Sequence, residues 1–172
     1  MRLTSWTTHT PAGPLTLVLD DAAVVRAAGF TDDVHALAAR IGVRAGARAV
    51  SAVTDVGEIG KRVAAFLDGD LAALDAVPVD QGGTPFQHDV WDALRRIPPG
   101  QTRSYAALAA MADRPQAVRA AGSACGRNLL APFVPCHRAV RGDGGLGGYA
   151  YGLAAKRWLL GHERVHLPHA AR

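Results

Sequence analysis

Apolar residues in the first part of the chain alternate with polar ones in a pattern typical of paired strands. Leu15, Leu17 and Leu19 occupy every second position of the run 14–19, and Asp20-Asp21 separates this run from the apolar stretch 22–30. Period-two alternation favours a half-buried strand, and a short polar break between two such runs favours a hairpin. We therefore expect residues 14–30 to form a β-hairpin.

Two helices and a short strand are predicted between this hairpin and residue 83. Asp32 and Asp33 can cap a helix over 34–41. A second helix should end at Asp68-Gly69-Asp70. Its apolar stripe consists of Ile59, Val63, Ala64, Phe66 and Leu67. A strand near 76–79 and a linker over 81–83 complete a small module, residues 1–83, in which no catalytic motif stands out.

The second half opens with a strong helix signal. Thr84 can cap, Pro85 suits the first helical position, and Gln87 can close a capping box. The helix should end at Pro98-Pro99-Gly100, because proline has no N–H to donate. Its apolar face consists of Phe86, Val90, Trp91, Leu94 and Ile97.

Two more helices are expected around a tight turn. Ser104 can cap a helix over 105–111, the turn lies at 113–115, and Pro115 opens a second helix running through Cys125. This arrangement suggests helix-turn-helix geometry, of the winged-helix kind, for DNA binding. The second helix is rich in Ala, Gly and Ser, so its backbone can approach a partner closely while Arg119 projects from it. We therefore expect an α+β protein with a mostly helical domain over residues 84–172.

Charge distribution supports a polyanionic partner for the second domain. Residues 1–83 carry 7 basic and 10 acidic side chains, whereas residues 84–172 carry 12 basic and 5 acidic ones. The second domain is thus the natural place for a polyanion such as DNA to dock, the alternative being a merely basic surface. Candidate phosphate contacts are Arg95, Arg96, Arg103, Arg114 and Arg127.

Composition predicts a globular protein of the cytoplasm. The chain is 49% hydrophobic and 20% charged, and it has no apolar run long enough for a membrane span and no secretory signal pattern. Two cysteines, Cys125 and Cys136, are too few for a disulfide framework, and without a second metal-spaced pair they do not indicate a zinc site. We expect reduced thiols and no structural zinc site.

Cys136 stands in the segment Val134-Pro135-Cys136-His137-Arg138, after a near-continuous apolar run. A buried thiol is usually inert, because a low dielectric disfavours the thiolate, and it becomes a nucleophile only beside a base or a positive charge. His137 and Arg138 could supply both. Cysteine and histidine side by side do not by themselves establish a nucleophile, since a buried cysteine is more often a small hydrophobic residue.

The motifs together resemble the O6-alkylguanine-DNA alkyltransferase family. Pro135-Cys136-His137-Arg138 is similar to its acceptor-cysteine motif, and the match covers essentially all of residues 84–163. The other matching segments are Phe86-Gln87, Val90-Trp91, Ile97–Gly100, Ser104-Tyr105, Ala117–Ala120, Gly126–Asn128, Gly147–Tyr149 and Lys156–Leu160, leading to Glu163.

This resemblance implies a single-turnover repair reaction without a cofactor. Cys136 would accept a methyl or other alkyl group from O6-alkylguanine, with O4-alkylthymine as a further substrate left open. His137 would act through a water as base, and Glu163 would orient it. Tyr105 would help to turn the nucleotide out of the helix and donate a proton, and Asn128 would organise the hinge before the cysteine segment.

The resemblance also implies a DNA surface, a pocket and a ribonuclease-H-like fold for residues 1–83. Arg119 would fill the gap left by the flipped nucleotide. The remaining DNA contacts would be Tyr105, Ser104, Arg127 and Arg138, and the pocket would be formed by Tyr149, Ala150, Tyr151, Val134 and Pro135. The protein would act as a monomer, with cooperative binding along DNA left open.

Several positions depart from the family pattern, and three other functions are to be weighed. Leu129, Ala139 and the pair Ala150-Tyr151 differ from the residues usual there, and Tyr151 could narrow the pocket rim against bulky adducts. A damage-binding alkyltransferase-like protein would lack the acceptor that Cys136 provides. A cysteine hydrolase using Cys136, His137 and Glu163 would turn over repeatedly, and no oxyanion site is recognisable. A helix-turn-helix regulator should carry more base-reading side chains than the second helix offers.

Overall fold

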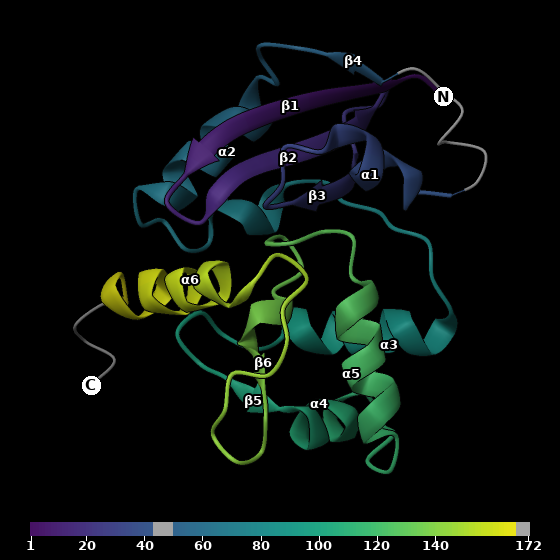
Figure 1. Cartoon of the computed structure of the whole chain (residues 1–172), viewed down its shortest axis with the longest axis vertical. Helices are drawn as coiled ribbons and strands as arrows, with labels where there is room; N and C mark the ends of the chain where they lie inside the picture. Colours follow the sequence, from purple (N-terminus) through teal and green to yellow (C-terminus); the bar gives the residue numbers. More distant parts are fainter. Residues whose placement is uncertain (43–49, 168–172) are drawn as a thin grey trace. The chain divides into compact units, whose positions relative to one another are not determined.

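The computed structural model describes residues 1–42 and 50–167, which divide into two compact units. The first unit consists of residues 1–82 together with Leu129–Phe133, and the second consists of Gly83–Asn128 with the residues from Val134 onward. Figure 1 shows a sheet with helices in the first unit and a mostly helical second unit. The chain is thus a mixed α/β protein. The inclusion of Leu129–Phe133 in the first unit was not expected from the sequence.

The first unit is built on a four-stranded sheet in the order β3-β2-β1-β4. Strands β1 (Leu3–Thr10) and β2 (Gly13–Asp20) form an antiparallel hairpin, β3 (Val25–Gly29) pairs antiparallel with β2, and β4 (Val50–Ala52) runs parallel to β1. The predicted pairing of residues 14–19 with 22–30 is confirmed as β2 with β3. Strands β1 and β4 were not predicted.

Strand β2 is buried on both faces, not only on the face formed by its alternating leucines. Every residue from Leu15 to Leu19 is buried, including Thr16, whose hydroxyl donates to the carbonyl of Thr31 over 2.6 Å. A hydroxyl on the buried strand is therefore tolerated because it has a partner.

Helices and one returning segment complete the first unit. Helix α1 (Val34–Ala39) is capped by Asp33, whose carboxylate accepts from the Ala36 N–H, and α2 spans Glu58–Leu67, so both predicted helices are confirmed. The expected strand at 76–79 is wrong except for a single parallel bridge between Val79 and Val25, because a short 3₁₀ helix, η1 (Ala73–Ala76), occupies its start.

The core of this unit joins residues that are far apart in the sequence. Leu129 donates its N–H to the side chain of Gln81 over 2.7 Å and accepts at its carbonyl from Ala28 over 2.7 Å. These bonds fix the start of the segment that leads to Cys136. The buried cluster consists of Leu3, Val18, Ala27, Leu37 and Leu129.

The second unit begins with three packed helices. Helix α3 (Pro85–Arg95) has the predicted capping box, in which Thr84 accepts from the Gln87 N–H and the Gln87 side chain accepts from the Thr84 N–H. The Trp91 indole donates to the carbonyl of Ala124 over 2.9 Å and so ties α3 to helix α5 (Val118–Arg127). Helix α4 (Tyr105–Met111) is capped by Ser104 as expected.

Helix α5 starts three residues later than the sequence indicated. Residues 114–117 form a turn, closed by the Ala117 N–H to the carbonyl of Arg114, and Ala117 has a non-helical ψ of 44°. Strand β5 (Arg103–Ser104), which precedes α4, pairs in parallel with β6 (Ala139–Val140), which comes after α5. Helix α6 (Leu153–Val165) is the last helix described. In the part of the chain that the structure describes, no helix is long and apolar enough to cross a membrane.

Candidate active site

The cysteine segment forms a tight turn that exposes one side chain and buries the next two. Residues Cys136–Arg138 make a 3₁₀ turn, η2, in which the Cys136 N–H donates to the Val134 carbonyl over 2.9 Å and the Arg138 N–H to the Pro135 carbonyl over 3.0 Å. Cys136 is partly exposed, whereas His137 and Arg138 are buried. The turn therefore presents the thiol while its neighbours face the protein interior.

Asn128 fixes the thiol from the end of α5. Its side-chain amide donates to the Val134 carbonyl over 2.9 Å and to the Sγ of Cys136 over 3.2 Å, and Asn128 itself is buried. A donor aimed at sulfur favours the anionic form of the thiol. Asn128 thus both anchors the cysteine segment and contacts its sulfur.

Glu163 on α6 receives hydrogen bonds from two segments of the chain. Its carboxylate bonds the Nε2 of His137 at 2.7 Å, the guanidinium of Arg138 at 2.7–3.1 Å and the Gly100 N–H at 3.1 Å. Burial acts to raise the pKa of Glu163, but the bonds and charges of His137 and Arg138 outweigh it and lower the pKa to about 2. Glu163 is therefore ionised at neutral pH and can only accept.

This carboxylate decides which nitrogen of His137 carries the proton. Burial lowers the pKa of His137, although Glu163 opposes the shift, so the imidazole is neutral at neutral pH. Since Glu163 only accepts, Nε2 is the protonated nitrogen and Nδ1 holds a lone pair. Nδ1 is buried and has no hydrogen-bond partner among the described residues. His137 is thus prepared to accept a proton at Nδ1.

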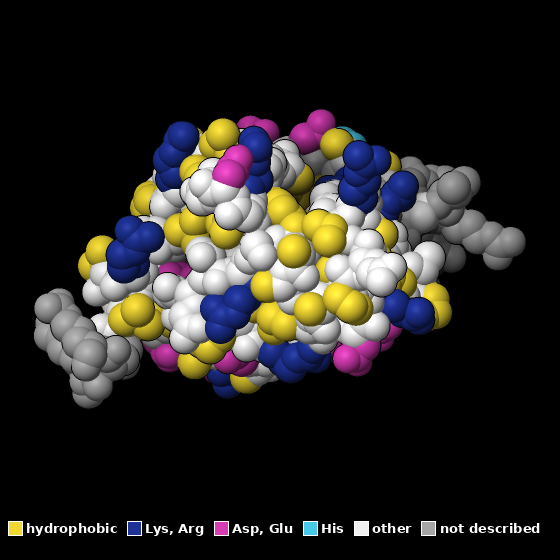
Figure 2. All heavy atoms as spheres, turned by 90° about the horizontal axis from the view of Figure 1, so that it is seen from below, with side chains coloured by type: hydrophobic (Ala, Val, Ile, Leu, Met, Phe, Trp, Pro, Cys, Tyr) yellow, Lys and Arg dark blue, Asp and Glu magenta, His cyan; other side chains and the backbone are white. Residues whose placement is uncertain are grey.

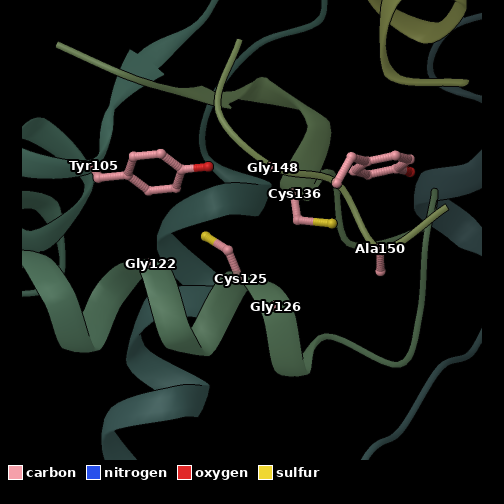
Figure 3. A pocket seen from close by; sticks show the side chains of 8 residues that line it. Tyr105, Gly122, Cys125, Gly126, Cys136, Gly148 and Ala150 are labelled. Carbon is pink, nitrogen blue, oxygen red and sulfur yellow. The ribbon is translucent and has the colours of Figure 1, made fainter. Parts of the chain in front are cut away.

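A cavity of about 340 Å³ adjoins the thiol. Figure 3 shows Gly122, Cys125 and Gly126 along one side of α5, with Cys136 opposite and the Tyr105 hydroxyl pointing toward the segment that carries it. The volume of the cavity is within the usual range of small-molecule sites. The lining residues are Tyr105, Gly122, Cys125, Gly126, Cys136, Gly148, Tyr149 and Ala150.

The phenols and the second thiol of this cavity are neutral at physiological pH. Burial, with lesser contributions from the thiols, raises the pKa of Tyr105, and burial raises that of Tyr149 well above its usual value. Burial raises the pKa of Cys125 to about 12. The two tyrosines therefore remain proton donors, and Cys125 remains a protonated thiol.

The residues expected to form the pocket fall into two groups. Tyr149 and Ala150 line the cavity. Val134 and Pro135 are buried beside Cys136, and Tyr151 packs edge-on against Tyr149, with ring centroids 5.7 Å apart and planes at 73°. Cys125, Gly122 and Gly126 were not assigned to the pocket from the sequence, although their i, i+3, i+4 spacing places them on one face of a helix.

Side chains expected to contact DNA are also divided. Arg119 and Arg127 are exposed on α5, and Tyr105 and Ser104 are partly exposed. Arg138 does not fit that expectation, because it is buried with its guanidinium bonded to Glu163 and to the carbonyl of Ile97 at 2.7 Å. We assign Arg138 to the support of Glu163 instead. Figure 2 shows basic side chains dispersed among apolar ones on a face seen from the side of α4.

The site is therefore a cysteine at the wall of a small cavity, beside a buried histidine that is hydrogen-bonded to a carboxylate. Comparison with known proteins then identifies the family of the chain. Residues 85–165 match the model of the 6-O-methylguanine DNA methyltransferase DNA-binding domain. The methylated-DNA–protein-cysteine methyltransferase of Salmonella typhimurium is 40% identical over 166 residues, or 95% of this chain and 96% of that protein. The chain belongs to the methylated-DNA–protein-cysteine methyltransferase family.

Further similarities agree with this assignment. The constitutive methylated-DNA–protein-cysteine methyltransferase of Bacillus subtilis is 50% identical over 91 residues, covering 52% of this chain and 55% of that protein. A crystal structure of Mycobacterium tuberculosis OGT in complex with DNA superimposes with a TM-score of 0.79 at 32% identity, covering 98% of this chain and 97% of that one. The similarity thus extends over both units.

Proposed function

We propose that this protein repairs O6-alkylguanine in double-stranded DNA by irreversible transfer of the alkyl group to Cys136. The observation that carries the proposal is the arrangement around the thiol, in which Asn128 donates to Sγ and His137, hydrogen-bonded to Glu163 through Nε2, presents a free Nδ1. Membership in a family of DNA alkyltransferases supports DNA as the substrate.

The reaction follows from the protonation states at the site. The Cys136 thiol gives its proton, through a water, to Nδ1 of His137, and Glu163 stabilises the resulting imidazolium. The thiolate attacks the alkyl carbon, forming a C–S bond as the C–O6 bond breaks, and the electron pair passes to guanine. Tyr105, whose phenol is neutral, donates a proton to the departing base, and the proton taken up by His137 then returns through water to the Tyr105 phenolate. The products are guanine and a thioether, so each molecule acts once.

Access to the alkylated oxygen requires the nucleotide to leave the helix. Extruding a base costs a few kcal/mol, least for a damaged pair. We assign α4 and α5 to a helix-turn-helix, with Arg119 entering the duplex in place of the flipped nucleotide. Ser104, Tyr105 and Arg127 contact the strand beside it, Tyr149 and Ala150 contact the base, and Val134, Pro135 and Tyr151 support them.

The role of the first unit is structural in this proposal. Its sheet and helices are consistent with a ribonuclease-H-like module, and its contribution is to hold Leu129–Phe133, the segment that leads to the acceptor turn. We also propose that the protein acts as a monomer in the cytoplasm. It should need no metal or organic cofactor, since the proposed reaction uses only protein side chains and water.

One measurement tests the reaction directly. The protein is incubated with duplex DNA bearing O6-methylguanine and weighed intact by mass spectrometry. We expect one added methyl group in the wild type and in Cys125→Ser, and none in Cys136→Ser. An unchanged mass with the lesion still present contradicts the proposal, and repeated turnover of substrate would favour a cysteine hydrolase instead.

A further inference from the structure

Lys156 is a fully buried lysine whose three donors are all matched by backbone carbonyls. Its side chain is 0% exposed, and Nζ donates to the carbonyls of Ala139 at 2.7 Å, Leu146 at 2.5 Å and Gly148 at 3.2 Å. Burying an ammonium is costly unless it is fully hydrogen-bonded. The three carbonyls supply these hydrogen bonds and so offset the cost of burying the Lys156 ammonium.

The three carbonyls belong to two separate segments of the second unit. Ala139 directly follows the turn that carries Cys136, whereas Leu146 and Gly148 lie in the stretch 141–152, which we call the glycine-rich loop. Gly148 and the two residues after it line the cavity. A single ammonium therefore connects the segment that carries Cys136 to the glycine-rich loop, part of which lines the cavity.

The glycine-rich loop needs such an anchor. Half of its twelve residues are glycine, and glycine leaves the backbone many accessible conformations. The loop also packs closely against Tyr105, because a Cβ on Gly147 would lie 2.8 Å from the Tyr105 hydroxyl oxygen. A small displacement of the loop would change the distance between Tyr105 and the wall that faces it.

Composition gives independent support. Of the 19 basic side chains, 17 are arginine, and Lys156 is one of only two lysines, the other being Lys61. A planar guanidinium directs its donors within one plane, whereas an ammonium can direct three donors at three converging carbonyls. Burial lowers the pKa of Lys156, while a negative charge on Cys136 acts in the opposite direction and favours the ammonium.

We propose that Lys156 is a positioning residue for alkyl transfer, whose ammonium holds the glycine-rich loop at the distance from Cys136 and Tyr105 that the reaction requires. The inference rests on the proposed function and extends it to a residue that touches neither the DNA nor the reacting atoms. Loss of the Lys156 ammonium should therefore slow the alkyl-transfer step and leave the affinity for DNA unchanged, because Lys156 does not contact the exposed arginines of α5 that we assign to DNA binding.

The test compares single-turnover methyl transfer from O6-methylguanine duplex DNA in the wild type, Lys156→Met and the control Lys61→Met. Lys61 is exposed on α2 in the first unit. We expect Lys156→Met to slow the rate constant at saturating DNA by about 10- to 100-fold, the cost of a small misplacement of reacting groups. The DNA concentration for half-saturation should change by less than about twofold, since phosphate contacts set the affinity. Lys61→Met should match the wild type.

Chemical rescue separates positioning from general destabilisation. Lys156→Ala should lose rate similarly and regain part of it with added n-propylammonium, which restores the missing atoms, but not with tetramethylammonium, which has no N–H. A variant that lowers only the fraction of reactive molecules, with an unchanged rate constant, overturns the proposal. So does a wild-type rate in Lys156→Met or, if that variant does not fold, in Lys156→Arg. Absence of transfer by the wild type refutes the proposed function itself, and this inference with it.

Discussion

The side-chain amide of Asn128 donates to the Sγ of Cys136 over 3.2 Å, and the same nitrogen donates to the Val134 carbonyl over 2.9 Å. Asn128 is the only asparagine in the sequence, and it lies where α5 ends. A single side chain therefore holds the acceptor segment and polarises its reactive atom.

Replacing this donor should weaken the nucleophile. In Asn128→Ala, the loss of a hydrogen bond to a developing thiolate should slow methyl transfer by about tenfold or more. The rate of Cys136 alkylation by iodoacetamide, measured against pH, should show the thiolate forming only at higher pH. Asn128→Asp is the matched variant, because it keeps the size but offers sulfur a negative charge, and it should be slower still. A wild-type pH profile in both variants contradicts this role.

The ionisation of His137 predicts the acid limit of the reaction. Burial lowers the pKa of His137 below the ordinary 6.5. At pH 6.5 the imidazole should therefore still be mostly neutral, with Nδ1 available to take the thiol proton, and it should become protonated only at lower pH. Transfer should therefore continue at pH 6.5 and decline in more acidic solution, with an apparent pKa that belongs to the thiol–imidazole pair. Single-turnover rates across this range measure it.

Glu163→Gln is the control for that profile. Glu163, with a pKa of about 2, stays ionised throughout, so it adds no limb of its own. A glutamine can donate to Nε2 and so favour the wrong tautomer, and transfer should slow by about 10² to 10⁴, the usual contribution of a general base. A variant with the wild-type rate shows that His137 is not oriented through this contact.

Local signals in the sequence were sufficient for the capped helices. The capping box at Thr84 and Gln87 and the cap at Ser104 are confirmed because their hydrogen bonds form within a few residues. Strand β1 was missed because Ser5 and Trp6 interrupt any simple alternation, and its hydrogen bonds are made with β2 and β4. The partner of a strand is distant in the sequence, so the pairing cannot be predicted from the residues of one strand alone.

The site shows the same division. The pairing of His137 with Glu163, 26 positions apart, was expected only through the family resemblance, since nothing in either local sequence requires it. The role of Arg138 was misjudged because an arginine reads as a surface charge until its partner is known, and here that partner is Glu163. The contact of Lys156 with three carbonyls depends on a loop fold that composition does not specify.

Cys125 should not compete with Cys136 as acceptor. Both thiols line the cavity, but burial raises the pKa of Cys125 to about 12, so its thiolate is scarce at neutral pH. Limited iodoacetamide followed by peptide mapping should label Cys136 and leave Cys125 unmodified, and Cys125→Ser should retain methyl transfer. Equal labelling of the two cysteines at neutral pH contradicts this assignment.

Tyr151 should restrict bulky adducts. Its ring packs edge-on against Tyr149, which lines the cavity, so a large group that displaces Tyr149 must also displace Tyr151. We expect O6-benzylguanine in DNA to react more slowly than O6-methylguanine, by about tenfold, the scale on which a hydrophobic pocket discriminates. Tyr151→Gly should raise the benzyl rate and leave the methyl rate nearly unchanged. Equal wild-type rates for the two adducts would remove the reason for assigning Tyr151 this role.

Arg119 should matter for duplex DNA but not for the free base. It is exposed in the first turn of α5, and in the proposed complex it replaces the flipped nucleotide, offsetting an unstacking cost of a few kcal/mol. Arg119→Ala should therefore slow repair of duplex DNA by about tenfold to 100-fold. Transfer from free O6-methylguanine, which needs no flipping, should be unaffected.

Arg127→Ala is the matched control, because Arg127 is exposed at the other end of the same helix. As a phosphate contact it should weaken binding to all sequences alike and reduce the salt slope by about one. Its single-turnover rate at saturating duplex should remain that of the wild type, since the loss of a phosphate contact is compensated by more DNA. An equal loss on free base and duplex in Arg119→Ala would place this arginine in the folding of α5 and not in the DNA.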